Sequence, residues 1–282
     1  MKYTNYLAFR DDCRLHGIEY AAARSVRLGF DSVEFLDICP FSMPLYQSMD
    51  MMHVKHTLTQ NGLTVACYSL AADLLTSNQV VLKDQLRRHI EFSAEVGAPY
   101  FHHTLAPALS IGKQAPTYPS VLNRVLETAV WIAEQCANYG LTCLYEPQGM
   151  YFNGVEGLQN LYQNVGRVCK NVGICGDVGN SLFVDVSVNE IYDAFAKDIR
   201  HVHIKDYLLC DRMSKDQDNC FLTRGGQWIS ECSIGEGVTD FSYCFDWLRR
   251  VNYDAAIAFE ISGNDETLTR ALRYIQSMLL CK

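Results

Sequence analysis

Four short apolar segments of the chain each end in a side chain that can bind a metal ion. These side chains are Glu146, Asp177, His203 and Glu260. Carboxylate and imidazole groups are common protein ligands of divalent cations. If the segments are parallel strands whose carboxyl ends meet, three carboxylates come together, and their repulsion in a poorly solvated site favours a bound cation. We therefore expect one divalent metal ion, and these ligand types fit manganese, magnesium, cobalt or zinc.

The alternation of side chains along these segments favours the same four residues. In a strand, successive side chains point to opposite faces. Around Glu260 the alternate positions 257, 259 and 261 are apolar, so its carboxylate is expected on the other face, directed into a barrel. The same pattern directs Glu146 and Asp177 inward and places His203 and Lys205 together. The alternative interpretation is that the four residues are unrelated polar strand ends, each neutralised by a lysine or arginine side chain.

Further side chains are candidates for contacts with a substrate, because they can bind hydroxyl or anionic groups or stack on a sugar ring. They are Lys205, His102, Trp228 and Arg10. Lys205 has an alternative role as a structural ion pair with Asp206 or Glu236. For His102 the alternative is a hydrogen-bonded core position, and its neighbour His103 faces the opposite way in a strand.

The elements that would carry these residues alternate along the chain. Apolar segments predict strands at 6–9, 32–36, 64–70, 100–105, 142–146, 173–178, 200–206 and 255–261. Segments of helical spacing lie between them, and several end at a glycine: Gly29, Gly62, Gly97 and Gly140. Eight units of about 35 residues indicate an α/β fold, the (β/α)8 TIM barrel, in one domain over residues 1–282. A doubly wound open sheet is the alternative, but the first turn lacks its glycines.

One connection is unusually long for this architecture. About thirty residues, 207–237, separate the strand that ends at Asp206 from the next expected helix, near Phe241. Loops of this length in compact domains usually carry a lid or a binding surface. We expect that role here, with a surface insertion as the alternative.

Composition argues against several classes of function. The chain has 24 Lys+Arg against 32 Asp+Glu, a net charge of −8 at pH 7, so we expect no nucleic-acid partner. It has no apolar run of about 18 residues that would cross a membrane, and from its first residues we expect no signal peptide. Twelve cysteines without a C-x-x-C pair then fit reduced thiols, and we expect a cytoplasmic protein.

Several motifs of the chain resemble those of one known family. They are the segments 203–206 (HIKD), 234–237 (IGEG), 253–256 (YDAA), 259–260 (FE) and 27–34 (RLGFDSVE). On these the chain resembles the xylose-isomerase-like TIM-barrel superfamily, in particular its sugar phosphate isomerase/epimerase family. The resemblance implies that Glu146, Asp177, His203 and Glu260 bind one divalent metal ion, the same set that strand alternation selects.

Two departures from the family pattern bear on function. Many members carry a second histidine where this chain has Asn180, which suits a hydrogen bond to a substrate hydroxyl better than a metal ion. The related apurinic endonucleases hold a zinc cluster with extra histidines and an Asp-x-His element, which is missing from the region 225–234. Together with the acidic net charge, this argues against a role in DNA repair.

The resemblance implies a reaction at a carbon next to a carbonyl. A metal ion bound to the carbonyl and adjacent hydroxyl stabilises the enediolate that forms when the proton leaves, with Glu146 and Glu260 as base and acid. Return of the proton on the opposite face is epimerisation of a sugar or sugar phosphate, and return to the neighbouring carbon is aldose–ketose isomerisation. The alternative is a metal-dependent dehydratase of a cyclitol or shikimate-type substrate. A non-catalytic sugar-binding protein is a further alternative, and by analogy a homo-oligomer is expected.

Overall fold

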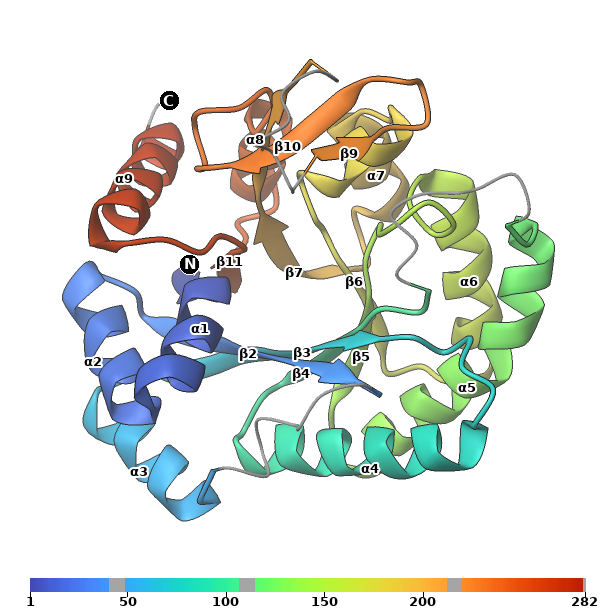
Figure 1. Cartoon of the computed structure of the whole chain (residues 1–282), viewed down its shortest axis with the longest axis horizontal. Helices are drawn as coiled ribbons and strands as arrows, with labels where there is room; N and C mark the ends of the chain where they lie inside the picture. Colours follow the sequence, from blue (N-terminus) through green and yellow to red (C-terminus); the bar gives the residue numbers. More distant parts are fainter. Residues whose placement is uncertain (41–48, 107–114, 212–219, 281–282) are drawn as a thin grey trace.

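The central feature of the fold is a closed barrel of parallel strands. The computed structural model describes residues 1–40, 49–106, 115–211 and 220–280, and within them eight strands close in the order β1-β11-β7-β6-β5-β4-β3-β2 (Figure 1). The strands are β1 (Lys2–Asn5), β2 (Ser32–Cys39), β3 (Thr64–Ala72), β4 (Tyr100–His103), β5 (Thr142–Tyr145), β6 (Val172–Cys175), β7 (Ile199–Ile204) and β11 (Ala256–Phe259). The predicted (β/α)8 TIM barrel is confirmed.

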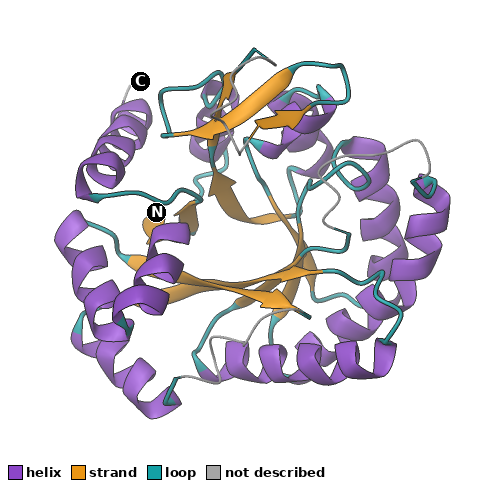
Figure 2. Ribbon diagram, in the orientation of Figure 1, coloured by secondary structure: helices purple, strands orange, loops and turns teal. Residues whose placement is uncertain are grey.

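Helices surround the barrel (Figure 2). In chain order they are α1 (Leu7–His16), α2 (Ile18–Leu28), α3 (Met51–Gln60), α4 (Gln79–Glu95), α5 (Tyr118–Asn138), α6 (Val155–Val168), the 3-10 helix η2 (Asn180–Val184), α7 (Val188–Phe195), α8 (Ser242–Arg250) and α9 (Asp265–Leu280). The four glycines predicted at helix ends have φ between 67° and 95°, the left-handed region that ends a helix. Within the described ranges, no helix is long and apolar enough to span a membrane.

The first strand is not where the apolar run predicted it. The segment 6–9 belongs to the start of the helical region, with α1 beginning at its second residue, and β1 lies earlier. The hydroxyl of Thr4 and the amide of Asn5 are hydrogen-bonded inside the fold, the amide to Ser25 Oγ at 2.9 Å. Because two of its four residues, Thr4 and Asn5, are polar, the strand carries no apolar run that a sequence search would detect. Arg10 therefore lies on α1 and not at a strand end.

The long connection after β7 folds into a second, small sheet. Its strands β8 (Asp206–Leu209), β9 (Cys220–Leu222) and β10 (Trp228–Cys232) are antiparallel, in the order β8-β10-β9. The sheet is seen at the top of Figure 1. Much of the predicted loop is thus regular structure, and its residues 212–219 lie outside the described residues.

One carboxylate accepts hydrogen bonds from both ends of this connection. Asp206, at the start of β8, accepts a hydrogen bond from the backbone N–H of Tyr207 and further ones from Gly235, Gly237 and Thr239 at the other end, all 2.9 to 3.0 Å long. Gly237 has no room for a side chain, because a Cβ there would overlap an oxygen of Asp206. The connection therefore returns to the place where it began.

Candidate functional site

The four candidate metal ligands lie together at the carboxyl ends of four neighbouring strands. Glu146 follows β5, Asp177 follows β6, His203 belongs to β7 and Glu260 follows β11. One possible ligand atom from each residue lies within 4.8 Å of the others. Three of the residues are buried, and the Glu260 side chain is 18% exposed. The inward orientation predicted from alternation is confirmed, since the side chains at the alternate positions pack in the outer core.

One atom of each of these residues has no hydrogen-bond partner within the described structure. The atoms are Glu146 Oε2, Asp177 Oδ2, His203 Nδ1 and Glu260 Oε2. The imidazole nitrogen lies 3.3 Å from the Glu146 oxygen and 3.5 Å from the Glu260 oxygen. Buried polar atoms are normally hydrogen-bonded, so four atoms without a hydrogen bond among the described residues mark a place that a cation would fill. Three carboxylates and one imidazole are a donor set that fits a divalent ion.

Burial and neighbouring charges shift the proton affinities of these groups. Burial raises the pKa of the Asp177 carboxyl to about 7, against the opposing effect of the Lys205 ammonium group 3.3 Å away. Burial also acts to raise the pKa of the Glu146 carboxyl, but His102 and His203 beside it hold that pKa well below its usual range. Without an ion, Asp177 is therefore partly protonated near neutral pH, and a bound cation would displace the proton.

Lys205 brings an ammonium group into this acidic cluster. Its Nζ lies 2.7 Å from Glu260 Oε1 and 3.3 Å from Asp177 Oδ2. Burial acts to lower the pKa of this ammonium group, but the two carboxylates hold it well above its ordinary value. Lys205 therefore stays charged. The ion pairs found for it in the described structure are with Glu260 and Asp177, and not with Asp206 or Glu236 as the structural alternative required.

Glu34, on β2, belongs to the same network and was not among the predicted site residues. Its buried carboxylate accepts hydrogen bonds from His201 Nε2 at 2.7 Å, His203 Nε2 at 3.0 Å and Ser69 Oγ at 2.5 Å. Burial acts to raise the pKa of Glu34, but the two histidines hold it well below its usual range. The sequence signal that could have identified Glu34 was its position between two apolar residues of one strand, which directs its carboxylate to the opposite, inner face.

Two predicted substrate contacts lie beside the cluster. Asn180 begins η2, and its backbone N–H donates to Asp177 Oδ1 at 2.6 Å. Its side-chain Nδ2 is buried and lacks a hydrogen-bond partner in the part of the chain that the structure describes. His102 Nε2 lies 3.3 Å from Glu146 Oε1, whereas the ring of His103 packs in the outer layer. As predicted, only one of the two histidines reaches the site.

The other two predicted contacts, Arg10 and Trp228, are not found lining the cavity next to the cluster. This cavity has a volume of about 380 Å³, and its described lining includes Lys205, Glu260 and Glu231. Arg10 forms an ion pair with the adjacent aspartate on α1, and Trp228 lies on β10, where it is paired with β9. Both predictions depended on elements that fold differently: a first strand that is a helix, and a loop that is a sheet.

The sequence matches the family model described as xylose isomerase-like TIM barrel over residues 22–278. The chain belongs to this family. Among curated proteins, a ketose 3-epimerase from Arthrobacter globiformis is 25% identical over 256 residues, which are 86% of this chain and 77% of the relative.

Solved structures of other proteins share this xylose isomerase-like fold. D-psicose 3-epimerase with D-tagatose from Clostridium cellulolyticum H10 has a TM-score of 0.74 at 14% identity, covering 100% of both chains. IolI with a zinc atom has a TM-score of 0.74 at 13% identity, covering 99% of this chain and 98% of IolI. The probable 3-DHS dehydratase AsbF from Bacillus anthracis has a TM-score of 0.74 at 13% identity, covering 98% and 99%. At these identities the likeness is one of fold.

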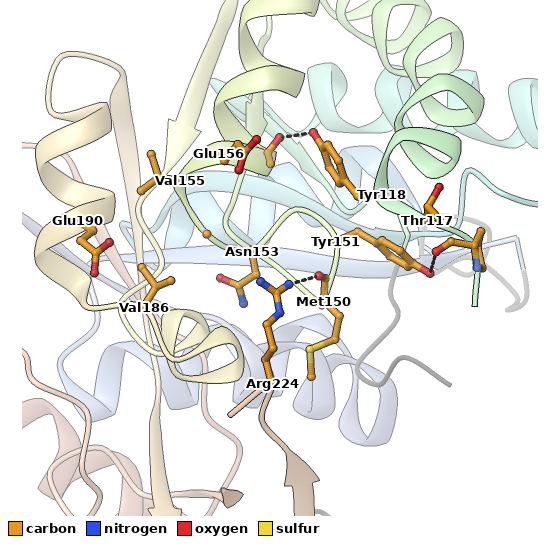
Figure 3. Close-up of a pocket in the computed structure, with 13 residues that line it drawn as sticks. Thr117, Tyr118, Met150, Tyr151, Asn153, Val155, Glu156, Val186, Glu190 and Arg224 are labelled. Carbon is orange, nitrogen blue, oxygen red and sulfur yellow. Dashed lines mark hydrogen bonds between the residues drawn. The ribbon is translucent and has the colours of Figure 1, made fainter. Parts of the chain in front are cut away.

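A second, larger cavity of about 610 Å³ lies where helices α5, α6 and α7 begin (Figure 3). Its described lining contains none of the four candidate ligands. Arg224 spans it and donates a hydrogen bond of 2.7 Å to the carbonyl of Met150. Asn153, also in this lining, donates to the carbonyl of Asn180 at 2.5 Å. The cavity thus borders the segment that carries Asp177 without reaching the cluster.

Proposed function

We propose that this protein is a divalent-metal-dependent epimerase or isomerase of a sugar or sugar phosphate, acting on a carbon next to a carbonyl. The observation that carries the proposal is a group of four ligand residues, each with one buried atom that lacks a hydrogen bond among the residues that the structure describes. The ketose 3-epimerase relative supports a ketose as substrate. Glu146, Asp177, His203 and Glu260 would hold manganese, magnesium, cobalt or zinc. When bound, such an ion polarises a carbonyl and stabilises the negative charge that develops on its oxygen.

On this proposal, Glu146 and Glu260 transfer protons on two sides of a substrate. The strands that precede them, β5 and β11, are separated in the barrel by β6 and β7. One carboxylate removes the proton from the carbon next to the carbonyl, and the other carboxyl group delivers a proton to the opposite face. The carbon is then inverted, and proton exchange with water restores both groups.

On this proposal, Lys205 and Asn180 orient the substrate. The charged ammonium group of Lys205 can donate to a substrate oxygen in the cavity that it lines. The unpartnered Nδ2 of Asn180 is a second donor for a hydroxyl group. His102, next to Glu146, holds that carboxylate in place. These contacts fix which carbon lies between the two glutamates, and that position decides between epimerisation and aldose–ketose isomerisation.

A metal-dependent dehydratase of a cyclitol or shikimate-type substrate is the second candidate. The fold likeness to AsbF favours it. The same first proton transfer would then be followed by loss of a β-hydroxyl group, which takes its proton from the second carboxyl group and leaves as water. The two candidates differ in their products, because dehydration forms a carbon–carbon double bond and epimerisation does not.

The test is an incubation in deuterated water with each metal ion in turn. The ketoses are D-allulose, D-tagatose and L-ribulose, and a dehydroshikimate is the dehydratase substrate. An epimerase incorporates one deuterium at C3 with inversion, an isomerase incorporates it at the neighbouring carbon, and a dehydratase releases one water. NMR and mass spectrometry distinguish the three products.

Matched glutamate variants assign the reaction to the cluster. Glu146→Gln and Glu260→Gln each keep the side-chain shape and remove a proton-transfer group, so turnover should fall by about a thousandfold or more. Glu95→Gln, an exposed position on α4, is the control and should leave turnover unchanged. A wild type that takes up none of the four metal ions refutes the proposal, and one that turns over none of these ketoses with any of the ions refutes it for unphosphorylated sugars.

A further inference from the structure

We propose that Glu34 is a positioning residue that sets the metal affinity of the cluster, because it determines which nitrogen of His203 is available to an ion. The inference rests on the proposed function, since it takes His203 as a ligand. Nothing in the alternation of strand residues or in the comparisons assigns Glu34 a role. It lies on β2, which is not one of the four strands that carry the candidate ligands.

The first step is the chemistry of the imidazole ring. A ring nitrogen binds a metal ion through its lone pair, so the proton of a neutral histidine ligand must be on the other nitrogen. His203 Nε2 lies 3.0 Å from Glu34 Oε1, while Nδ1 lies near Glu146 and Glu260 and has no hydrogen-bond partner within the described residues. A carboxylate can only accept, so Glu34 keeps the proton on Nε2 and leaves Nδ1 for the ion.

The second step is a branch from the same carboxylate to another candidate ligand. Ser69 Oγ donates to Glu34 Oε1 at 2.5 Å and lies 2.9 Å from His102 Nδ1. His102 Nε2 in turn lies 3.3 Å from Glu146 Oε1. With its hydroxyl proton directed at Glu34, Ser69 accepts the proton of His102 Nδ1, so His102 can also donate from Nε2 to Glu146 only as an imidazolium with both ring nitrogens protonated. Glu34 therefore orients His203 directly and positions the His102 ring beside Glu146 through Ser69.

The third step separates this role from that of an ordinary buried ion pair. Glu34 also accepts from His201 Nε2 at 2.7 Å, and the His201 ring packs edge-on against His203, with centroids 5.0 Å apart. A purely structural carboxylate would need these donors only to offset its burial. Loss of His201 and loss of Glu34 would then have the same effects on stability and on metal affinity. On our proposal they differ, since His201 approaches none of the four unpartnered ligand atoms within hydrogen-bond distance in the described structure.

The experiment compares metal binding with stability. Metal-free wild type, Glu34→Gln and His201→Asn are titrated with zinc and with manganese, each alone, by calorimetry, and their unfolding is measured in urea. Removal of a carboxylate that orients a histidine ligand should raise the dissociation constant about 10- to 100-fold in Glu34→Gln. His201→Asn should lower stability but change the dissociation constant far less. Ser69→Ala, which keeps Glu34 and cuts the branch to His102, should give an intermediate rise.

The outcomes distinguish this inference from the proposed function. If the wild type binds an ion and Glu34→Gln binds it equally well, the role of Glu34 is refuted and the metal site stands. If the wild type binds no ion, both are refuted. If Glu34→Gln does not fold, nitrogen NMR of the histidine rings in the zinc-loaded wild type decides. A proton on Nε2 of His203 supports the role, and zinc on Nε2 overturns it.

Discussion

Lys205 Nζ lies 2.7 Å from one carboxylate oxygen of Glu260, and the other oxygen of that carboxylate has no hydrogen-bond partner among the described residues. The two oxygens of Glu260 therefore have different surroundings. One faces a fixed positive charge, and the other faces the cluster of unpartnered ligand atoms. An ammonium group this close to a cation site repels the ion that the carboxylates attract.

Replacement of Lys205 by methionine should separate binding from turnover. Without the ammonium group, a divalent ion is no longer repelled, and its dissociation constant should fall about tenfold. Turnover should fall about a hundredfold, because the substrate loses a charged donor. Calorimetric titration with manganese and a turnover assay measure the two effects. If affinity and turnover both fall, Lys205 instead serves to hold the carboxylates in place.

Gly179 should tolerate no side chain, because of close packing rather than backbone conformation. Its φ is −85°, which any residue adopts, but a Cβ would lie 2.9 Å from the carbonyl oxygen of Lys205 and would overlap its side chain. Gly179→Ala should therefore lower the free energy of unfolding by about 2 kcal/mol and displace Lys205. Gly166→Ala on α6 is the matched control: its nearest neighbour would be 3.9 Å away. It should stabilise by about 0.5 to 1 kcal/mol. Urea unfolding measures both, and equal effects would contradict the packing argument.

The stability of the fold should decline in mild acid through His89. This histidine of α4 is buried, its Nδ1 lies 2.7 Å from the Tyr68 hydroxyl, and burial lowers its pKa to about 3. In the unfolded chain the pKa is about 6.5, so between these values only the unfolded state takes up the proton, and acidification favours unfolding. From pH 7 to pH 5 this should cost about 2 kcal/mol. In urea unfolding at both pH values, His89→Gln should lack that part of the pH dependence. Parallel pH dependences in the two proteins would refute the assignment.

Asp206→Asn should loosen the long connection. An asparagine offers one acceptor oxygen and directs an NH2 group at backbone N–H donors, so part of the four hydrogen bonds to Asp206 must be lost. The free energy of unfolding should fall by about 3 kcal/mol. Limited proteolysis should cut within 207–237 earlier than in the wild type. Asp254→Asn, at an exposed position, is the control and should match the wild type in both measurements.

The sequence indicated the barrel and its inward polar groups because both depend on short-range periodicity. In the strand 255–261 the large apolar side chains occupy alternate positions, Ile257, Phe259 and Ile261, so the direction of Glu260 could be predicted without a structure. The first strand could not, because Thr4 and Asn5 find their hydrogen-bond partners only once distant segments have folded around them.

The partners of Glu34 and the pairing of the small sheet could not be predicted from local patterns. Glu34 is separated from His203 by 169 positions, and only closure of the barrel brings them to 3.0 Å. The small sheet has strands of three to five residues, too short for periodicity to show, and its central strand β10 pairs with the preceding strand β9 and also with the more distant β8. Glu231 therefore reaches the cavity from β10 without any sequence signal.

The hydrogen bonds that join both ends of the segment 207–237 to Asp206 also bear on how the sequence of such a protein can change during evolution. Because the segment leaves and rejoins the barrel at one point, its length and sequence can change without altering the distance that the barrel must bridge. The segment lies beside the cluster and forms part of the cavity wall. Related proteins with the same four ligands could therefore acquire new substrate preferences through changes in this segment alone.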